Sequence, residues 1–254
     1  VKLPMLPFHT WLPDAHSEAP TGGSVLLAGV LLKMGGYGLI RFCLPIFPEM
    51  AHSFAPAVLW LSVLGILYGG YMALAQTDLK RLVAYSSISH MGFVTLGIFS
   101  FNNEGIAGAT LQMVTHGITT GAMFLIVGQL YDRTHSREIA DYGGLQARMP
   151  RFVAVLSLFA VASFGLPTTS NFIGEFLILV GVSYQNFLFV VMAMGGIVLG
   201  AAYMLWMLQR VAFGQPRTEA AKNLTDLNFR EMSTLVPLAI AVIAIGVYLS
   251  LIHI

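Results

Sequence analysis

The sequence predicts an all-α polytopic membrane protein, because its composition and its long apolar runs both point to that class. Of its 254 residues, 56% are hydrophobic and only 10% are charged, whereas a soluble domain carries about 25% charged residues. The mean hydropathy is +0.76. Apolar segments of about 20 residues, the length that crosses a bilayer as a helix, recur along the chain with short links between them. We therefore expect about seven full transmembrane helices plus a partial one, in a single membrane domain over residues 1–254.

The first elements are a broken helix and a full span. Residues 2–13 contain Pro4, Pro7 and Pro13, and proline removes a backbone donor and clashes with the preceding turn. We therefore expect the end of an interrupted helix there, followed by the first full span over residues 21–43. Hydropathy predicts the further spans at 57–76, 83–100, 106–130, 153–183, 188–209 and 234–252.

The segment 153–183 is long for one straight crossing. Gly165-Leu166-Pro167 interrupts its middle, so we predict a discontinuous helix near Pro167. The Leu-Pro break near Pro4 is a possible counterpart. Paired interrupted spans are typical of inverted-repeat transporters, in which the ion path runs through the breaks.

Lysine and arginine residues outside the spans fall almost entirely on one side of the predicted membrane. The opposite side receives Arg41 alone. Basic loops mark the cytoplasmic side, so the basic side is expected to be cytoplasmic, or matrix or stroma in an organelle. It receives Lys80, Arg81, Arg133, Arg137, Arg148, Arg151, Arg210, Arg217, Lys222 and Arg230.

Five ionisable residues are predicted to lie inside the membrane, and such residues are functional candidates by default. Lys33 lies twelve residues after Thr21, about 18 Å along a helix and so near the midplane, where a lysine costs about 2.5 kcal/mol or more. The alternative for each is a structural role, as a paired charge or a hydrogen-bonded helix contact. The five candidates are Lys2, Lys33, His90, His116 and Glu175.

Several function classes are disfavoured. The net charge of +1 argues against a nucleic-acid partner. A single cysteine, Cys43, excludes an internal disulfide framework and any multi-cysteine metal or iron–sulfur site. No phosphate-binding glycine loop or cofactor motif appears, so we expect neither a cofactor site nor a metal site in this chain.

Three stretches, PFHTWLPDAHSEAPTGGSVLLAGVLLKMGGYGLIRF, DLKRLVAYSSISHMGFV and LPTTSNFIGEFLILVG, closely resemble the antiporter-like subunit M (subunit 4) family of respiratory complex I, the proton-pumping NADH:quinone oxidoreductase. The resemblance runs along essentially the whole chain. It implies a fourteen-helix fold with two inverted five-helix repeats. Residues 1–43 would end the first repeat, 57–209 would form the second five-helix repeat and 234–252 the C-terminal helix. The N-terminal part of the family fold is then expected to be missing.

The resemblance also implies a role for each candidate residue. Lys2 matches the lysine at the break of helix 7, and Lys33 matches the helix 8 lysine that links two half-channels. His90 and His116 match central-axis histidines, and Glu175 matches the acidic residue of the broken helix 12, on the proton exit side. The family's helix 5 glutamate, the partner of the helix 7 lysine, has no counterpart in this chain.

The function implied by the resemblance is that of a proton-translocating membrane-arm subunit without a redox centre of its own. NADH, FMN, iron–sulfur clusters and quinone would belong to partner subunits. The expected partners are other membrane-arm subunits, the lipid bilayer and protons, and the expected location is the bacterial inner (plasma) membrane or an organellar inner membrane. The alternatives are a subunit of a multi-subunit cation/proton antiporter, a membrane-bound hydrogenase subunit, and a structural spacer.

Overall fold

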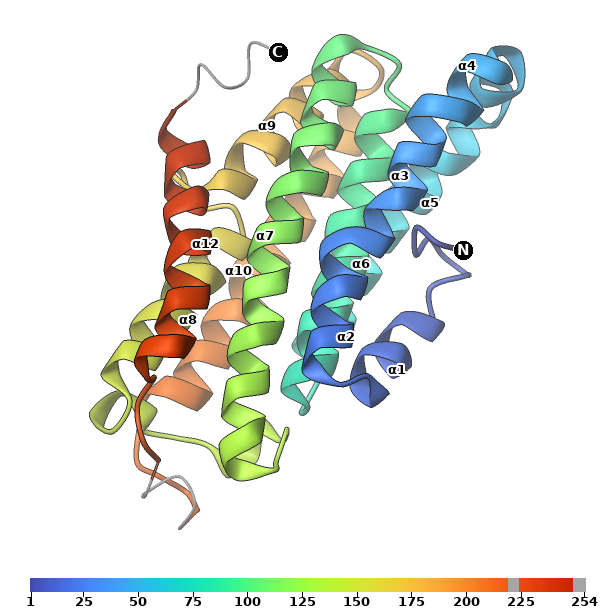
Figure 1. Ribbon diagram of the computed structural model, residues 1–254. Coiled ribbons are helices and arrows are strands. Elements are labelled where there is room, and N and C mark those ends of the chain that lie inside the picture. The colour runs from blue at the N-terminus through green and yellow to red at the C-terminus, as the bar shows by residue number, and fades with distance from the viewer. Residues whose placement is uncertain (219–223, 249–254) are drawn as a thin grey trace.

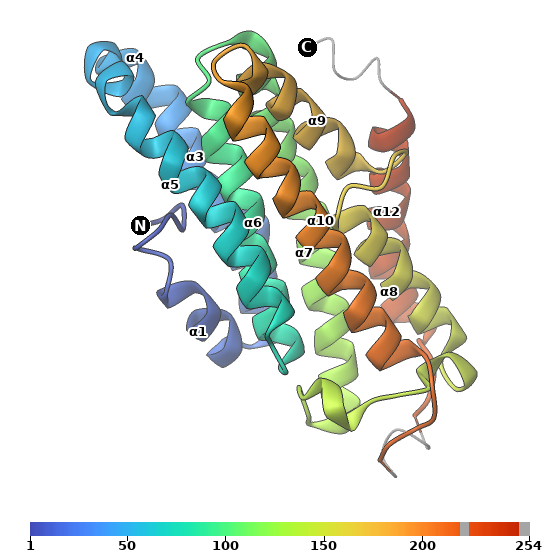
Figure 2. The same ribbon diagram turned by 180° about the vertical axis from the view of Figure 1, so that it is seen from behind.

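A computed structural model describes residues 1–218 and 224–248, and the prediction of an all-α membrane protein is confirmed over them. The helices stand side by side as one bundle, with α7 between α12 on one side and α2–α3 on the other (Figure 1). From behind, α5 and α10 cover the face opposite α12 and α2 (Figure 2). The α-helices are α1 Trp11–Glu18, α2 Thr21–Leu26, α3 Leu32–Gly38, α4 Leu44–Ile46, α5 Pro48–Leu74, α6 Leu79–Ile98, α7 Asn103–Thr134, α8 Pro150–Ser163, α9 Ser170–Ser183, α10 Phe187–Ala212 and α12 Phe229–Val247.

Within the described residues, five helices are long and apolar enough to cross a membrane. The predicted span 83–100 corresponds to α6, which is 20 residues long but falls outside this group because its serines and His90 lower its hydropathy. The predicted span 234–252 corresponds to α12, and residues 249–252 lie outside the described part of the chain. The five helices are Thr21–Ile46, Pro48–Leu74, Asn103–Thr134, Phe187–Ala212 and Phe229–Val247.

The predicted break near Pro167 is present. Helix α8 ends at Ser163 and α9 begins at Ser170. Gly165 adopts a φ of +73°, a conformation that glycine reaches without strain. Beyond it, Leu166 O accepts bonds from the backbone nitrogen and hydroxyl of Thr169, at 3.0 and 2.7 Å. The two half-helices therefore meet within the bundle, where the chain leaves the helical ladder.

The predicted span 21–43 is a continuous helix from Thr21 to Ile46 that contains two π-helical segments. These segments are Leu27–Leu31 and Leu39–Cys43, and they lie on either side of α3. π-segments widen a helix locally and are frequent at functional sites. Hydropathy carries no signal for them.

The prediction of a helix end over residues 2–13 is wrong for its first part. Residues 2–10 are not helical, and α1 begins only at Trp11. The reason is the pair of prolines, Pro4 and Pro7, which cannot donate to a helical ladder. The segment instead packs against α3, where a Cβ on Gly35 would lie 2.9 Å from the Leu3 nitrogen.

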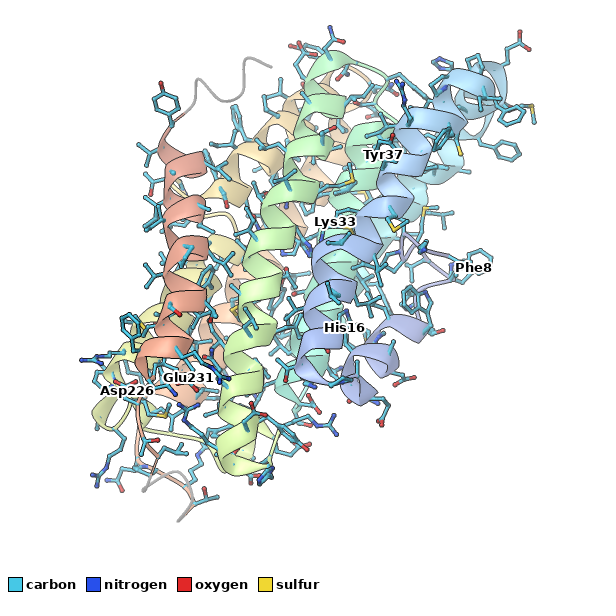
Figure 3. All side chains as sticks on the ribbon, viewed as in Figure 1. Phe8, His16, Lys33, Tyr37, Asp226 and Glu231 are labelled. Atoms are coloured by element: carbon cyan, nitrogen blue, oxygen red, sulfur yellow. The ribbon has the colours of Figure 1, made fainter. Side chains whose placement is uncertain are left out.

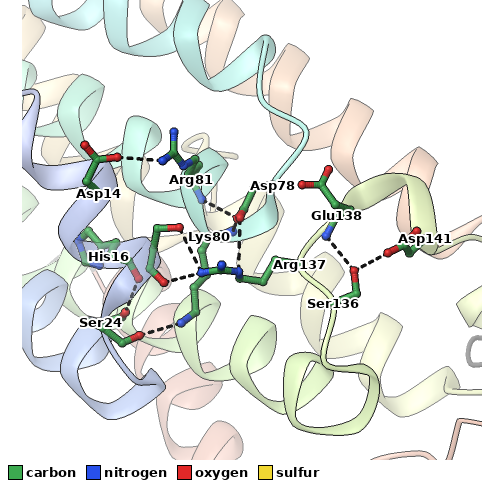
Figure 4. Close-up of polar contacts among 12 residues, drawn as sticks. Asp14, His16, Ser24, Asp78, Lys80, Arg81, Ser136, Arg137, Glu138 and Asp141 are labelled. Atoms are coloured by element: carbon green, nitrogen blue, oxygen red, sulfur yellow. Dashed lines mark hydrogen bonds and ion pairs between the residues drawn. The ribbon is translucent and has the colours of Figure 1, made fainter.

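Polar contacts tie the loops together at the end of the bundle where α6 begins and α7 ends, which we call the basic end. Asp78 caps α6 by accepting from the backbone nitrogens of Lys80 and Arg81, at 2.7 and 3.1 Å. Arg81 pairs with Asp14 of α1 at 2.9 Å, and Lys80 Nζ donates to Ala19 O at 2.9 Å (Figure 4). These contacts fix α1 against the start of α6.

The described lysine and arginine residues of the loops lie mostly at one end of the bundle. The starts of α6, α8 and α12 and the ends of α7 and α10 all lie at the lower end of the bundle in Figure 1. These are the helix ends that carry or adjoin the predicted basic cluster, whereas Arg41 lies in the segment Leu39–Cys43 at the opposite end. Lys222, the tenth member of that cluster, lies outside the described residues.

Candidate functional site

Lys33 lies on α3, directly after the π-segment Leu27–Leu31, and faces α7 (Figure 3). Its ammonium donates to Ala28 O within that segment and approaches Nδ1 of His116 at 2.7 Å. Lys33 also lines an open, mostly apolar groove of about 640 Å³ between its own helix and α7. The ammonium is therefore partnered from two sides although its surroundings are apolar.

Two histidines continue from Lys33 into the bundle. His116 on α7 is fully buried and His90 on α6 is 4% exposed. Their rings lie 5.3 Å apart between centroids, in an edge-on arrangement. A neutral imidazole carries a donor on one nitrogen and an acceptor on the other, so two neighbouring rings can take up and release protons in turn.

Glu175 ends the series. It lies on α9, five residues after that helix begins beyond the break, and is 3% exposed. Its Oε1 lies 3.1 Å from His90 Nδ1 and accepts a hydrogen bond from Gln112 Nε2 at 3.1 Å. A buried carboxylate without partners costs several kcal/mol. The contacts with His90 and Gln112 offset part of this cost.

Four of the five predicted residues therefore form one contact series, which we call the central row: Lys33, His116, His90 and Glu175. Its members come from α3, α7, α6 and α9. Apolar cores lie on either side of it, one around Leu82 and Phe159 toward the basic end and one around Phe93 and Ile178 toward the other. The row is thus a polar layer across an otherwise apolar interior.

Lys2 does not belong to the row in this structure. Its side chain is exposed, and only the backbone of the adjoining segment approaches α3. The proline-rich segment that carries Lys2 lies outside the bundle beside α3 and α5 (Figures 1 and 2). Lys2 is therefore the one candidate of the five that the structure does not bring together with the others.

Sequence reasoning missed Gln112, which holds Glu175 in place. It lies on α7 four residues before His116 and is fully buried. Residues four apart share a helix face, so a glutamine at this spacing from a candidate histidine is a signal that could have found it. A further histidine, His16 on α1, is also buried and stacks on Phe124 with ring centroids 4.3 Å apart.

The row consists of side chains that can carry protons. Histidines and carboxylates exchange protons in the physiological pH range when their surroundings permit. In the described part of the chain, no group of three or more His, Cys, Asp or Glu residues is placed to hold a metal ion. Fold and site together define a multi-pass helical membrane protein with a row of ionisable side chains across its interior.

Comparison with known proteins gives the family. The chain belongs to the family described as NADH:quinone oxidoreductase/Mrp antiporter, transmembrane, whose profile matches residues 1–200. The NADH-quinone oxidoreductase subunit M of Rhodobacter capsulatus is 51% identical over 252 residues, which cover 99% of this chain and 49% of that protein. The chain thus spans about half the length of the curated relatives that it matches.

Solved structures agree with this assignment. A chain of respiratory complex I from Thermus thermophilus with bound NADH is 34% identical with a TM-score of 0.92, over 99% of this chain and 53% of that one. A chain of the Mrp complex from Dietzia sp. DQ12-45-1b has a TM-score of 0.90 at 17% identity, over 98% of this chain and 55% of that one. The second likeness concerns the fold alone. The protein is therefore a membrane-embedded, multi-pass member of this family.

Proposed function

We propose that this chain is part of a proton-translocating membrane-arm subunit of NADH:quinone oxidoreductase. The observation that carries the proposal is the central row, in which Lys33 Nζ lies 2.7 Å from His116 and His90 lies 3.1 Å from Glu175. An isolated buried charge is costly, yet this row keeps an ammonium and a carboxylate at its two ends with two imidazoles between. A spacer that only packs against other subunits has no need of such a row.

In this proposal protons pass between Lys33 and Glu175 through the two histidines. Lys33 holds a proton, His116 accepts it on Nδ1, and His90 delivers it to the Glu175 carboxylate. A change in the charge of a neighbouring group moves the proton because like charges interact strongly in a poorly screened interior. Lys2 is assigned to the first step through the family resemblance alone. The chain itself holds no redox centre, and NADH, FMN, iron–sulfur clusters and quinone belong to partner subunits.

The proposed arrangement follows the family. Residues 1–43 end a first repeat, α5 to α10 form the second repeat of five crossings when α8 and α9 count as one, and α12 is the C-terminal helix. The basic end faces the cytoplasm of a bacterial cell, or the matrix of an organelle. The partners are the other membrane-arm subunits of the complex.

The test is Glu175→Gln in the full-length subunit of the intact complex, reconstituted in vesicles. The amide keeps an acceptor for Gln112 but cannot carry a proton, so NADH-driven acidification and coupled turnover should be lost. Glu104→Gln is the matched control, since Glu104 is an exposed carboxylate in the first turn of α7. Acidification at the control's level in Glu175→Gln refutes the proposal.

The second candidate is a subunit of a multi-subunit cation/proton antiporter, since the family covers both kinds of protein. Glu175 favours the oxidoreductase, because by the resemblance the antiporter subunits carry lysine at this position. The vesicle assay separates the two. Sodium-dependent dissipation of a pH gradient without NADH would establish the antiporter.

A further inference from the structure

Asn171 is a fully buried amide side chain that the central row does not use, and it lies beside the break between α8 and α9. It is the second residue of α9. It precedes Glu175 by four residues, so the two side chains lie on the same face of that helix. A buried amide costs free energy unless its polar atoms find partners, so the partners of Asn171 indicate what it does.

The first partner is the carbonyl of Ser163, the last residue of α8. In a continuous helix this carbonyl would accept from the backbone nitrogen four residues later. That residue is Pro167, which has no N–H. Asn171 Nδ2 donates to Ser163 O instead, at 3.4 Å. The amide therefore replaces the donor that the proline lacks, and it joins the end of α8 to the start of α9.

The second partner is Thr119 on α7, which is also fully buried. Asn171 Nδ2 lies 3.4 Å from Thr119 Oγ1, and Asn171 Oδ1 lies 3.5 Å from the same hydroxyl. The hydroxyl proton of Thr119 has a closer acceptor in Thr115 O, at 3.0 Å, so Thr119 accepts from Asn171. Thr119 follows His116 by three residues and lies on the same side of α7. Asn171 thus joins the break to the helix that carries His116.

Helices α7 and α9 are joined by two side-chain pairs near the row. One is Thr119 with Asn171, and the other is Gln112 with Glu175, in which Nε2 lies 3.1 Å from Oε1. On α9 the two pairs are four residues apart, which is about one helical turn. Together they set the position of Glu175 along α7.

The break itself forms part of the wall around the Glu175 carboxylate. A Cβ on Gly165, two residues after Ser163, would lie 2.8 Å from Glu175 Oε2. On its other side the break touches α12, because a Cβ on Gly246 would overlap Thr168 O. The end of α8 is therefore held by α12 from one side and by Asn171 from the other, and a shift of this end would move the wall around the carboxylate.

We propose that Asn171 is a positioning residue of the central row, whose amide holds the end of α8, the start of α9 and α7 together so that Glu175 stays in contact with His90. The inference rests on the proposed function. His90 Nδ1 lies 3.1 Å from Glu175 Oε1, and proton transfer requires this hydrogen-bond distance. Asn171 itself carries no proton for the row, because an amide does not titrate.

The test uses Asn171→Leu, Thr119→Val and Thr119→Ser, each in the full-length subunit of the intact complex in vesicles. Leucine has a side chain of similar size but no donor or acceptor. Valine at position 119 removes the oxygen that accepts from Asn171, whereas serine keeps it. A packing role for Thr119 predicts that serine is the more harmful change, because it removes a buried methyl group. A positioning role through the hydroxyl predicts that valine is.

Thr95→Val is the matched control. Thr95 is a buried threonine of α6 whose hydroxyl donates within its own helix to Gly92 O at 3.0 Å and accepts from Ser62 Oγ of α5 at 2.7 Å. Ser62 keeps a second partner, Val58 O at 2.7 Å, as Asn171 keeps Ser163 O when Thr119 is replaced. The control therefore loses the same kinds of contact at a place that does not touch Glu175.

Asn171→Leu should lower the rate of NADH-driven acidification about tenfold or more, since a displacement of about 1 Å can cost about 10²-fold. Thr119→Val should also be slower than the wild type, whereas Thr119→Ser and the control Thr95→Val should match it. The double variant Asn171→Leu with Thr119→Val should be no slower than Asn171→Leu alone, because both changes remove the same contact.

Wild-type acidification by Asn171→Leu, with Glu175→Gln inactive, would overturn this inference and leave the proposed function standing. A slower rate in Thr119→Ser than in Thr119→Val would overturn it as well. Acidification by Glu175→Gln would instead remove the proposed function, and the positioning role with it. If Asn171→Leu fails to assemble, the order of the two Thr119 variants decides.

Discussion

His116 is one of the two inner members of the central row, and replacing it can separate its two roles, as a partner of Lys33 and as a proton carrier. Its Nδ1 partners the Lys33 ammonium at 2.7 Å, and its ring lies 5.3 Å from that of His90. His116→Ala removes both the partner and the proton carrier. His116→Gln keeps an amide oxygen that can accept from Lys33 and removes only the imidazole.

The magnitudes follow from these contacts. A hydrogen bond to a charged group contributes about 1.5–3 kcal/mol, and each 1.36 kcal/mol is a factor of about ten. His116→Ala should therefore lower the equilibrium constant for placing the Lys33 ammonium at this position roughly ten- to a hundred-fold, in addition to removing the proton carrier. His116→Gln should keep Lys33 in place and still slow proton transfer by about 10² or more, the usual contribution of a positioned acid–base group.

The assay is NADH-driven acidification by the intact complex in vesicles, with His52→Gln as the matched control. His52 is an exposed histidine near the start of α5, tilted against Phe101 with ring centroids 4.0 Å apart, and it makes no contact with the row. Both His116 variants should fail to acidify the vesicles, and the control should acidify them normally. Normal acidification by His116→Gln would refute the idea that protons pass through this ring.

Two further predictions concern the framework around the row. Gly174→Ala should destabilise the protein by about 1–3 kcal/mol through overpacking, because its Cβ would lie 2.6 Å from Oε1 of Gln112 and displace the amide that holds Glu175. An unchanged thermal unfolding midpoint would contradict this. Asp226→Ala should cost about 1 kcal/mol, because the Asp226 carboxylate accepts from the backbone nitrogens of Arg151 and Phe152 in the first turn of α8, at 3.0 and 3.1 Å. Asp226 and the neighbouring Glu231 lie beside that turn in Figure 3. Faster hydrogen exchange at those two amides is the expected result, and unchanged exchange would argue against the cap.

Much of the fold was predictable because a membrane-spanning helix requires a run of about 20 apolar residues, which hydropathy detects. The break near Pro167 followed from a single proline in an apolar segment, and α8 and α9 end and begin on either side of it. The π-segments beside Lys33 and the irregular course of residues 2–10 were not predictable. The first depends on how α3 packs against α7, and the second on where a proline-rich segment finds contacts.

The individual residues of the candidate site were predictable from the sequence, but the contacts between them were not. Lys33, His90, His116 and Glu175 each stood out as an ionisable group in an apolar run, a rule that works because such groups are costly in a membrane. The family resemblance implies an order along a path, but the contacts between them came from the structure, since Lys33 and His116 are 83 residues apart. Gln112 escaped the rule because uncharged polar residues are common in membrane helices.

The central claim is that the row carries the protons that are translocated, and the most direct measurement is the number of protons moved per NADH oxidised. We would make it on the intact complex with Lys33→Ala in the full-length subunit, at matched rates of NADH oxidation. The account predicts a lower ratio than that of the wild type, because the first proton carrier of the row is gone. An unchanged ratio would contradict it.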